Sequence, residues 1–192
     1  MAERLPVRTR RILAADGSQH VSLYVACPRQ LASTDLETCK ACARAQNVSG
    51  RIVECSPNVP SGTRAESWAA SIAPHTVTCV RDSVIAASLA AWVPPEPWAV
   101  PVVDAAHRFI GFVSSSHIVA AGTTARLAMA LPVRELAFGS SLLVHEADPW
   151  PQALRHMAHH RASFVAVVDD SETPRGVLRD IDVLRLLSNR PG

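Results

Sequence analysis

The chain has 192 residues, of which 48% are hydrophobic and 19% charged, and its net charge is +2 with the histidines neutral. This length suffices for one sizeable hydrophobic core, and this composition excludes a disordered chain. The small net charge makes nucleic acid an improbable partner and gives no electrostatic reason to expect a membrane surface. The first twenty residues lack the apolar run of a secretory signal, so we expect a cytoplasmic protein with no membrane segment.

Four of the five cysteines gather in the first 60 residues, with the spacing C-x11-C-x2-C-x12-C; they are Cys27, Cys39, Cys42 and Cys55. Residues 20–26 predict a strand that ends at the first of these cysteines. Thr34 and Glu37 have the spacing of a capping box, which predicts a short helix carrying the middle two. Residues 51–54 predict a strand that returns to the last. Because so short a scaffold builds little core, we expect a zinc ion bound by all four thiolates to stabilise it.

Other uses of these cysteines stay open. Four thiolates also suit an iron–sulfur cluster. Free thiols, or a redox pair formed by Cys39 and Cys42, are further possibilities. Cys79 lies in a predicted core strand, where it is expected to be a small buried apolar residue.

Residues 56–62 are rich in turn-forming residues and predict a linker, and residues 64–72 predict a short helix after it. Beyond this helix the chain repeats itself. Residues 77–121 align without a gap with residues 142–186, at the offset of 65 that takes Asp104 to Asp169. Self-similarity at a fixed offset is a signal of fold rather than of local preference.

Each copy predicts the order β-α-β-β-α. A short apolar strand, at residues 77–80 or 142–144, leads to a helix with Ser83 or Asp148 as its expected N-cap. The helix of the second copy is expected at residues 150–161. A β-branched strand ending in aspartate follows, then a polar turn, a strand near a glycine, and a final short helix. The two units are expected to pack together, since neither would bury its sheet well alone.

A strand ending in Val-Val-Asp, a turn, and a glycine-led strand running into a final helix resemble the CBS domain. The resemblance covers about residues 63–189, and a tandem pair of these domains resembles a Bateman module. It implies a mixed α/β (α+β) fold, a homodimer, and the binding of an adenosine nucleotide such as AMP or ATP, or a related adenosyl ligand, between the repeats. In such families a hydroxyl residue meets a phosphate and an aspartate accepts hydrogen bonds from the ribose.

Each copy of this chain keeps only part of that motif. The first copy retains Gly111 and the hydroxyl of Ser114, but His117 replaces the aspartate. The second copy, led by Gly176, retains the aspartate as Asp182, but Arg179 replaces the hydroxyl residue. Arg179 can pair with a phosphate. Asp182 fits equally well as a helix N-cap, and His117 as a cap or a surface histidine.

These features predict a cysteine-rich segment and linker at residues 1–60, a first CBS repeat at 61–123 and a second at 124–192. We expect a non-catalytic regulatory or sensor protein that dimerises through the CBS pair and contacts an unknown protein partner. One alternative is a ligand-free dimerising platform with a structural zinc site. A lesser alternative is a thiol redox protein acting through Cys39 and Cys42.

Overall fold

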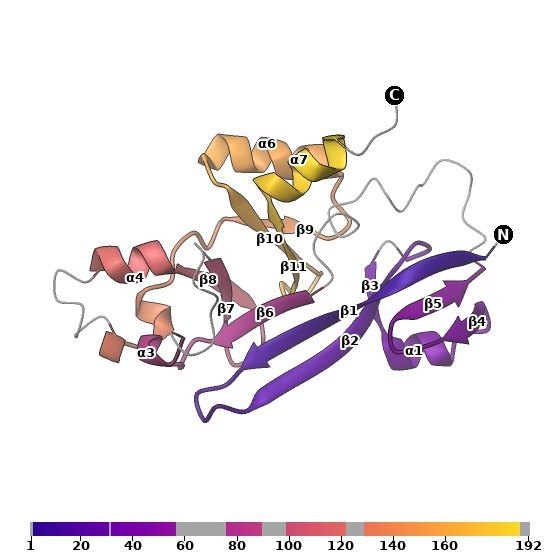
Figure 1. The fold of residues 1–192 in the computed structure, drawn as a ribbon, viewed down its shortest axis with the longest axis horizontal. Coiled ribbons are helices and arrows are strands. Elements are labelled where there is room, and N and C mark those ends of the chain that lie inside the picture. Colours follow the sequence, from indigo (N-terminus) through magenta and orange to yellow (C-terminus); the bar gives the residue numbers. More distant parts are fainter. Residues whose placement is uncertain (1, 31, 57–75, 90–98, 122–128, 189–192) are drawn as a thin grey trace.

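The computed structural model describes residues 2–30, 32–56, 76–89, 99–121 and 129–188. Two sheets organise these residues, and Figure 1 shows the second repeat standing above the larger sheet. The mixed α/β (α+β) fold class is as predicted from the sequence. The predicted helix at residues 64–72 lies outside the described residues. Within the described part of the chain, no helix is long and apolar enough to cross a membrane.

Both repeats have the predicted order of elements. The first contains β6 (Thr76–Arg81), α3 (Ala86–Leu89), β7 (Ala99–Val103), β8 (Phe109–Ser114) and α4 (Ser115–Ala121). The second contains β9 (Leu143–His145), α6 (Trp150–His160), β10 (Phe164–Val168), β11 (Pro174–Arg179) and α7 (Asp180–Ser188). A 3-10 turn, η2 (Val133–Glu135), lies between them.

The pairing of strands repeats as well as their order. In each copy the first strand is parallel to the second, and the second is antiparallel to the third. Gly111 lies opposite Val102, and Gly176 opposite Val167, with an irregularity of register next to each pair. The register of the antiparallel pair is therefore the same in both copies, whereas the parallel pair is shifted by one residue: Val80 pairs with Val102, but Val144 pairs with Val167.

The N-terminal segment contains more strands than the sequence predicted. These elements are β1 (Glu3–Leu13), β2 (Gln19–Cys27), β3 (Ala32–Asp35), α1 (Leu36–Lys40), β4 (Ala45–Val48) and β5 (Ile52–Cys55). The beginning of β1 pairs with β5, while its end runs parallel to β6 of the first repeat. The cysteine-bearing segment thus shares a continuous strand, and one sheet, with the first repeat.

Three predicted helix caps were wrong. Asp35, rather than Thr34, caps α1, and its carboxylate accepts a hydrogen bond from the backbone N of Glu37. Helix α3 begins at Ala86, beyond the turn that contains Ser83. Pro149 is the N-cap of α6, because the Asp148 carboxylate instead accepts a hydrogen bond from the backbone N of His145.

The main core joins the two repeats. Phe109 and Phe112 of the first repeat pack into a cluster otherwise formed by the second, which includes Val165, Met157 and Leu178. A smaller cluster of Leu5, Val25, Leu36 and Val53 lies under the cysteine-bearing segment. As predicted, Cys79 is a buried core residue.

Candidate functional site

A cleft of about 800 Å³ lies between the two repeats. Equivalent positions of the sequence repeat meet across it: Ala99 with Phe164, Ser114 with Arg179, and Ser115 with Asp180. These residues come from the β strands and from the first turns of α4 and α7. The cleft therefore brings together Ser114, the hydroxyl that the first copy retains, and Arg179, which replaces the hydroxyl residue at the equivalent position of the second copy.

The first-repeat side of the cleft is built around His117. Its Nδ1 lies 2.8 Å from the hydroxyl oxygen of Ser114, which also accepts a hydrogen bond from the His117 backbone N. The imidazole is stacked on the Phe138 ring, with 3.6 Å between ring centroids and 8° between planes. His117 is thus fixed against the cleft wall by one polar and one aromatic neighbour.

On the second-repeat side, Arg179 lines the cleft. Its Nε and Nη2 each lie 2.9 Å from a carboxylate oxygen of Asp182, a bidentate pair that fixes the plane of the guanidinium. Asp182 also accepts a hydrogen bond from the backbone N of Arg179, as a residue in the first turn of a helix can. Arg179 lines the cleft, whereas Asp182 lies behind it and does not.

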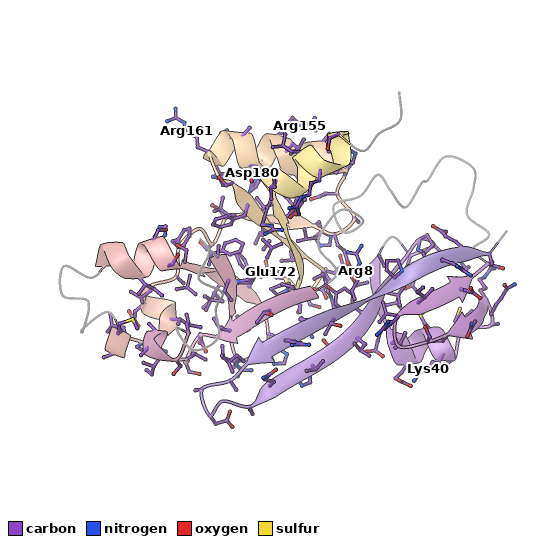
Figure 2. All side chains as sticks on the ribbon, in the orientation of Figure 1. Arg8, Lys40, Arg155, Arg161, Glu172 and Asp180 are labelled. Atoms are coloured by element: carbon purple, nitrogen blue, oxygen red, sulfur yellow. The ribbon has the colours of Figure 1, made fainter. Side chains whose placement is uncertain are left out.

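Further charged groups surround the same cleft. Arg161 ends α6 in a left-handed conformation, with φ of 51°, and lines the cleft together with His160. Figure 2 shows Arg161 at the end of α6, with its side chain extending outward from the second repeat. The lining of the cleft thus includes two guanidiniums, of which that of Arg179 is paired with Asp182, and one carboxylate, that of Asp180.

The two predicted glycines do not line the cleft. Gly111 has a φ of +149°, and a Cβ there would lie 2.8 Å from the carbonyl oxygen of Phe138. The backbones of Phe112 and Phe138 exchange two hydrogen bonds, of 2.8 and 2.9 Å. Gly111 therefore allows the segment that carries Phe138 to approach β8. Gly176 is buried within β11.

Sequence reasoning missed Phe138, Phe164 and Arg161 as cleft residues. Phe138 has no counterpart within the aligned repeat, and its place depends on its bridge to β8. Phe164 aligns with Ala99, so the comparison of the two copies did not single out an aromatic residue at this position. A basic residue at a helix C-terminus was the one available signal for Arg161.

The four cysteines of the N-terminal segment come close together without forming a metal site. Cys27, Cys42 and Cys55 line one cavity of about 360 Å³. Partial burial and the neighbouring thiols of those three residues raise the pKa of Cys39 to about 11. Nevertheless, no group of three or more His, Cys, Asp or Glu side chains among the described residues has the geometry of a metal site. The predicted zinc-binding segment is therefore not supported as a formed centre.

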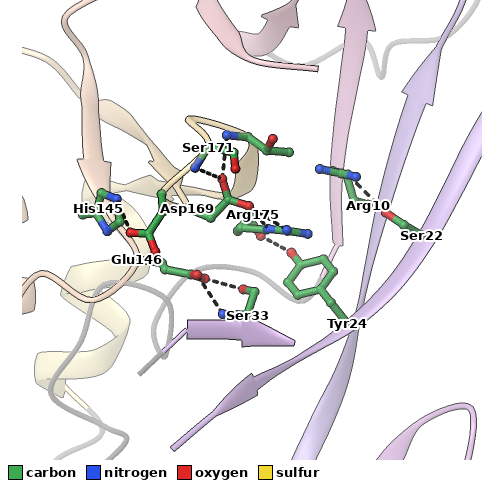
Figure 3. Close-up of polar contacts among 11 residues, drawn as sticks. Arg10, Ser22, Tyr24, Ser33, His145, Glu146, Asp169, Ser171 and Arg175 are labelled. Atoms are coloured by element: carbon green, nitrogen blue, oxygen red, sulfur yellow. Dashed lines mark hydrogen bonds and ion pairs between the residues drawn. The ribbon is translucent and has the colours of Figure 1, made fainter. Parts of the chain in front are cut away.

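A buried polar network joins the N-terminal strands to the second repeat, and the sequence did not predict it (Figure 3). The Tyr24 hydroxyl donates a hydrogen bond to the carbonyl oxygen of Arg175, whose guanidinium pairs with Asp169 at 2.6 Å. Burial raises the pKa of Tyr24 to about 12, so the hydroxyl keeps its proton at neutral pH. Ser33 donates to the buried Glu146 carboxylate.

Comparisons with known proteins agree with this architecture. Residues 133–189 match the family model of the CBS domain. No curated protein matches the chain.

Three similar solved structures have TM-scores just above 0.5. An acetoin utilization protein (AcuB) from Vibrio cholerae has a TM-score of 0.53 and 19% identity, over 64% of this chain and 90% of that one. The CBS domain pair of protein MJ0100, in complex with 5′-methylthioadenosine and S-adenosyl-L-methionine, has a TM-score of 0.53 and 21% identity, over 65% and 98%. The cytosolic domain of the Mg²⁺ channel MgtE, in complex with ATP, has a TM-score of 0.54 and 19% identity, over 63% and 49%. The chain therefore has the fold of a CBS-domain pair, and residues 133–189 match the CBS family itself.

Proposed function

We propose that the protein is a non-catalytic regulatory protein of the cytoplasm that senses an adenosine nucleotide or a related anionic adenosyl ligand. The ligand binds in the cleft between the two CBS repeats. The observation that carries this proposal is the meeting of Ser114 and Arg179 in one cleft. A hydroxyl and a guanidinium on facing walls can both contact a phosphate or another anionic group.

The chemistry of the cleft suits such a ligand in two further respects. The aromatic ring of Phe164 offers an apolar surface on which a base can pack. The cytosolic domain of MgtE, of similar fold, is in complex with ATP, and the CBS domain pair of MJ0100 is in complex with S-adenosyl-L-methionine and 5′-methylthioadenosine. Their identity to this chain is low, so they support the ligand class and leave the ligand itself to experiment.

Binding is tested by isothermal titration calorimetry with ATP, AMP, S-adenosyl-L-methionine and 5′-methylthioadenosine. We expect at least one to bind, and Arg179→Gln to weaken it about tenfold or more. Arg155→Gln is the matched control, since Arg155 lies on α6 and does not line the cleft. Absence of binding by all four ligands at millimolar concentration would refute this sensor function.

We also propose a homodimer formed through the CBS pair. Ile181 and Leu184 lie on α7, and 41% and 59% of their surfaces are exposed. Apolar side chains exposed side by side on one helix are suited to contact with a second copy. Light scattering on the purified chain is expected to give the mass of a dimer, and Leu184→Glu to give a monomer.

The alternative function is a ligand-free dimerising platform with a structural zinc site. The observation that favours the zinc site is the convergence of Cys27, Cys42 and Cys55 on one cavity, with Cys39 close enough for their charges to raise its pKa. Zinc would hold the four thiolates at about 2.3 Å from the metal, so the sulfurs must draw closer on binding. In that state the thiolates would fix the ends of β2 and β5 against α1.

Metal analysis of purified protein tests the zinc site separately from dimerisation. One equivalent of zinc, lost in Cys39→Ser, is the expected result, whereas iron with acid-labile sulfide would indicate a cluster. In the thiol redox alternative, the raised pKa of Cys39 leaves little thiolate on that member of the couple at neutral pH. The division into residues 1–60, 61–123 and 124–192 also stays a proposal, testable by limited proteolysis.

A further inference from the structure

The N-terminal strands contact the second repeat at one edge of its sheet (Figure 3). The hydroxyl of Tyr24, on β2, donates a hydrogen bond to the carbonyl oxygen of Arg175, near the start of β11. The Arg175 Cζ also lies 5.3 Å from the centre of the tyrosine ring, in a cation–π contact. Ser33, on β3, donates to the carboxylate of Glu146, which directly follows β9. The end of β9 and the start of β11 share this edge, because β9 runs parallel to β10 and β11 antiparallel to it.

The ligand cleft lies at the opposite edge of the same three strands. Phe164 begins β10, Arg179 ends β11, and both line the cleft. The side chains of Arg175, Val177 and Arg179 share one face of β11, since alternate residues of a strand face the same way. The first contacts Tyr24, and the other two line the cleft. About 13 Å of strand, at about 3.3 Å per residue, therefore connects the Tyr24 contact to the cleft.

Tyr24 and Ser33 belong, through their strands, to the sheet of the first repeat. In that sheet β3 pairs with β2, β2 with β1, and β1 with β6 of the first repeat. The two side chains thus hold the second repeat against the first from the edge opposite the cleft. Both contacts are buried, with Tyr24 1% and Glu146 2% exposed, so water competes little for them. The relative position of the repeats sets how Ser114 and Arg179 face each other across the cleft.

We infer that Tyr24 and Ser33 are positioning residues of the ligand cleft, acting on it from the far edge of the second repeat's sheet. This inference rests on the ligand-binding function proposed above and adds to it a role for the N-terminal strands. Neither residue lines the cleft. Tyr24 acts through the backbone of β11, which carries Arg179, and Ser33 acts through the segment that follows β9. Loss of both contacts leaves the second repeat freer to turn against the first, which misaligns the two walls of the cleft.

The test variant combines Tyr24→Phe with Ser33→Ala, which removes both hydroxyls and keeps the aromatic ring. Val53→Ala is the matched control, because Val53 is buried in a cluster whose described members all belong to the N-terminal segment. It lowers stability by leaving a cavity, without touching the contacts to the second repeat. Circular dichroism and thermal unfolding of the full chain check that both variants fold. All measurements are made well below the lower of the melting temperatures.

Amide hydrogen exchange of the ligand-free protein, followed by NMR, tests the positioning directly. The backbone N of Phe109 in the first repeat donates to the carbonyl oxygen of Glu172 in the second, at 2.9 Å, so its exchange reports on the contact between the repeats. The backbone N of Ala166 donates to the carbonyl oxygen of Leu142 within the second repeat, at 2.8 Å, and serves as the internal reference. We expect the test variant to exchange about tenfold faster at Phe109 relative to Ala166, and the control variant to keep the wild-type ratio.

Calorimetry with ATP, AMP, S-adenosyl-L-methionine and 5′-methylthioadenosine tests the effect on the cleft. We expect the test variant to weaken binding about 3- to 30-fold, and Val53→Ala to leave it unchanged. An unaltered exchange ratio at Phe109, or an unaltered affinity in the test variant, would overturn the role of Tyr24 and Ser33. An equal loss of affinity in both variants would overturn it too, since lower stability alone would then account for the loss. If the wild-type chain binds none of the four ligands, the proposed sensor function is refuted, and the exchange ratio alone decides whether the two residues position the repeats.

Discussion

Ser33 donates two hydrogen bonds, from its backbone N and its hydroxyl, to the carboxylate of Glu146. The first measures 2.7 Å, and Glu146 is only 2% exposed. Ser33 lies on β3, between two of the N-terminal cysteines, whereas Glu146 follows β9 of the second repeat. This contact between residues 113 positions apart ties the N-terminal segment to the second repeat directly.

Ser33→Ala is expected to destabilise the protein by about 1 to 2 kcal/mol, because a buried carboxylate loses one of its two donors. Urea unfolding followed by circular dichroism measures the change. Ser171→Ala is the control, since Ser171 is exposed in a turn and its side chain makes no hydrogen bond recorded in the described structure. Equal stability of the two variants would mean that the Ser33 hydroxyl contributes nothing.

Glu146→Gln is expected to change how stability depends on pH. Burial raises the pKa of Glu146 in the folded protein, against the opposing hydrogen bonds from Ser33. A carboxyl group with a raised folded pKa favours folding in its protonated form, and that contribution is lost as pH rises through the folded pKa. The free energy of unfolding of the glutamine variant relative to wild type should therefore increase as the pH rises above the ordinary glutamate pKa of 4.5 and through the raised pKa of Glu146 in the folded protein. Urea unfolding at several pH values measures it, and a difference that does not vary with pH contradicts the prediction.

Gly111→Ala is expected to lower the free energy of unfolding by at least about 2 kcal/mol. The backbone there has a positive φ, and the new Cβ would lie 2.8 Å from the Phe138 carbonyl oxygen. Ligand affinity should fall as well, since Phe138 forms part of the cleft. Gly50→Ala is the matched control, because a Cβ there has no neighbour within 4 Å. Thermal unfolding and calorimetry compare the two variants. Equal melting temperatures would argue against the close approach of the Phe138 carbonyl to position 111.

Asp182→Asn is expected to weaken the binding of ATP and the binding of 2′-deoxy-ATP to the same extent. Asp182 holds Arg179 in a bidentate pair and does not line the cleft, so its effect passes through the guanidinium. Calorimetry with both nucleotides measures this, with the exposed Asp170→Asn as control. A loss confined to ATP would instead place the carboxylate on the ribose.

Cys79 is expected to resist alkylation in the native protein. Its side chain is fully buried, and that burial raises the pKa of the thiol to about 12. Cys42 is exposed and is expected to react first in metal-free protein. Mass spectrometry after a short iodoacetamide pulse distinguishes the two sites, and rapid labelling of Cys79 before unfolding contradicts this account.

The sequence by itself determined the architecture of the two repeats. A gapless offset aligns Asp104 with Asp169 and Gly111 with Gly176, and the shared spacing of apolar and turn residues gives the antiparallel strands the same register in both copies. Local patterns could not place β1, however, because its pairing with β6 joins residues far apart in the chain. They also misplaced three helix caps; Asp148, for example, accepts a hydrogen bond from the backbone N of His145 rather than from the helix that follows it.

Only the tertiary structure decided how the candidate site is assembled. The sequence separates Ser114 from Arg179, and the packing of two pseudo-equivalent sheets brings both to one cleft. From the sequence, Asp182 fits a ligand-binding role and a helix cap equally well; in the structure both of its carboxylate oxygens accept hydrogen bonds from the Arg179 guanidinium. Such choices depend on distances between side chains that no spacing in the sequence encodes. The sequence therefore identified the residues of the motif, and the packing of the repeats determined which of them line the cleft.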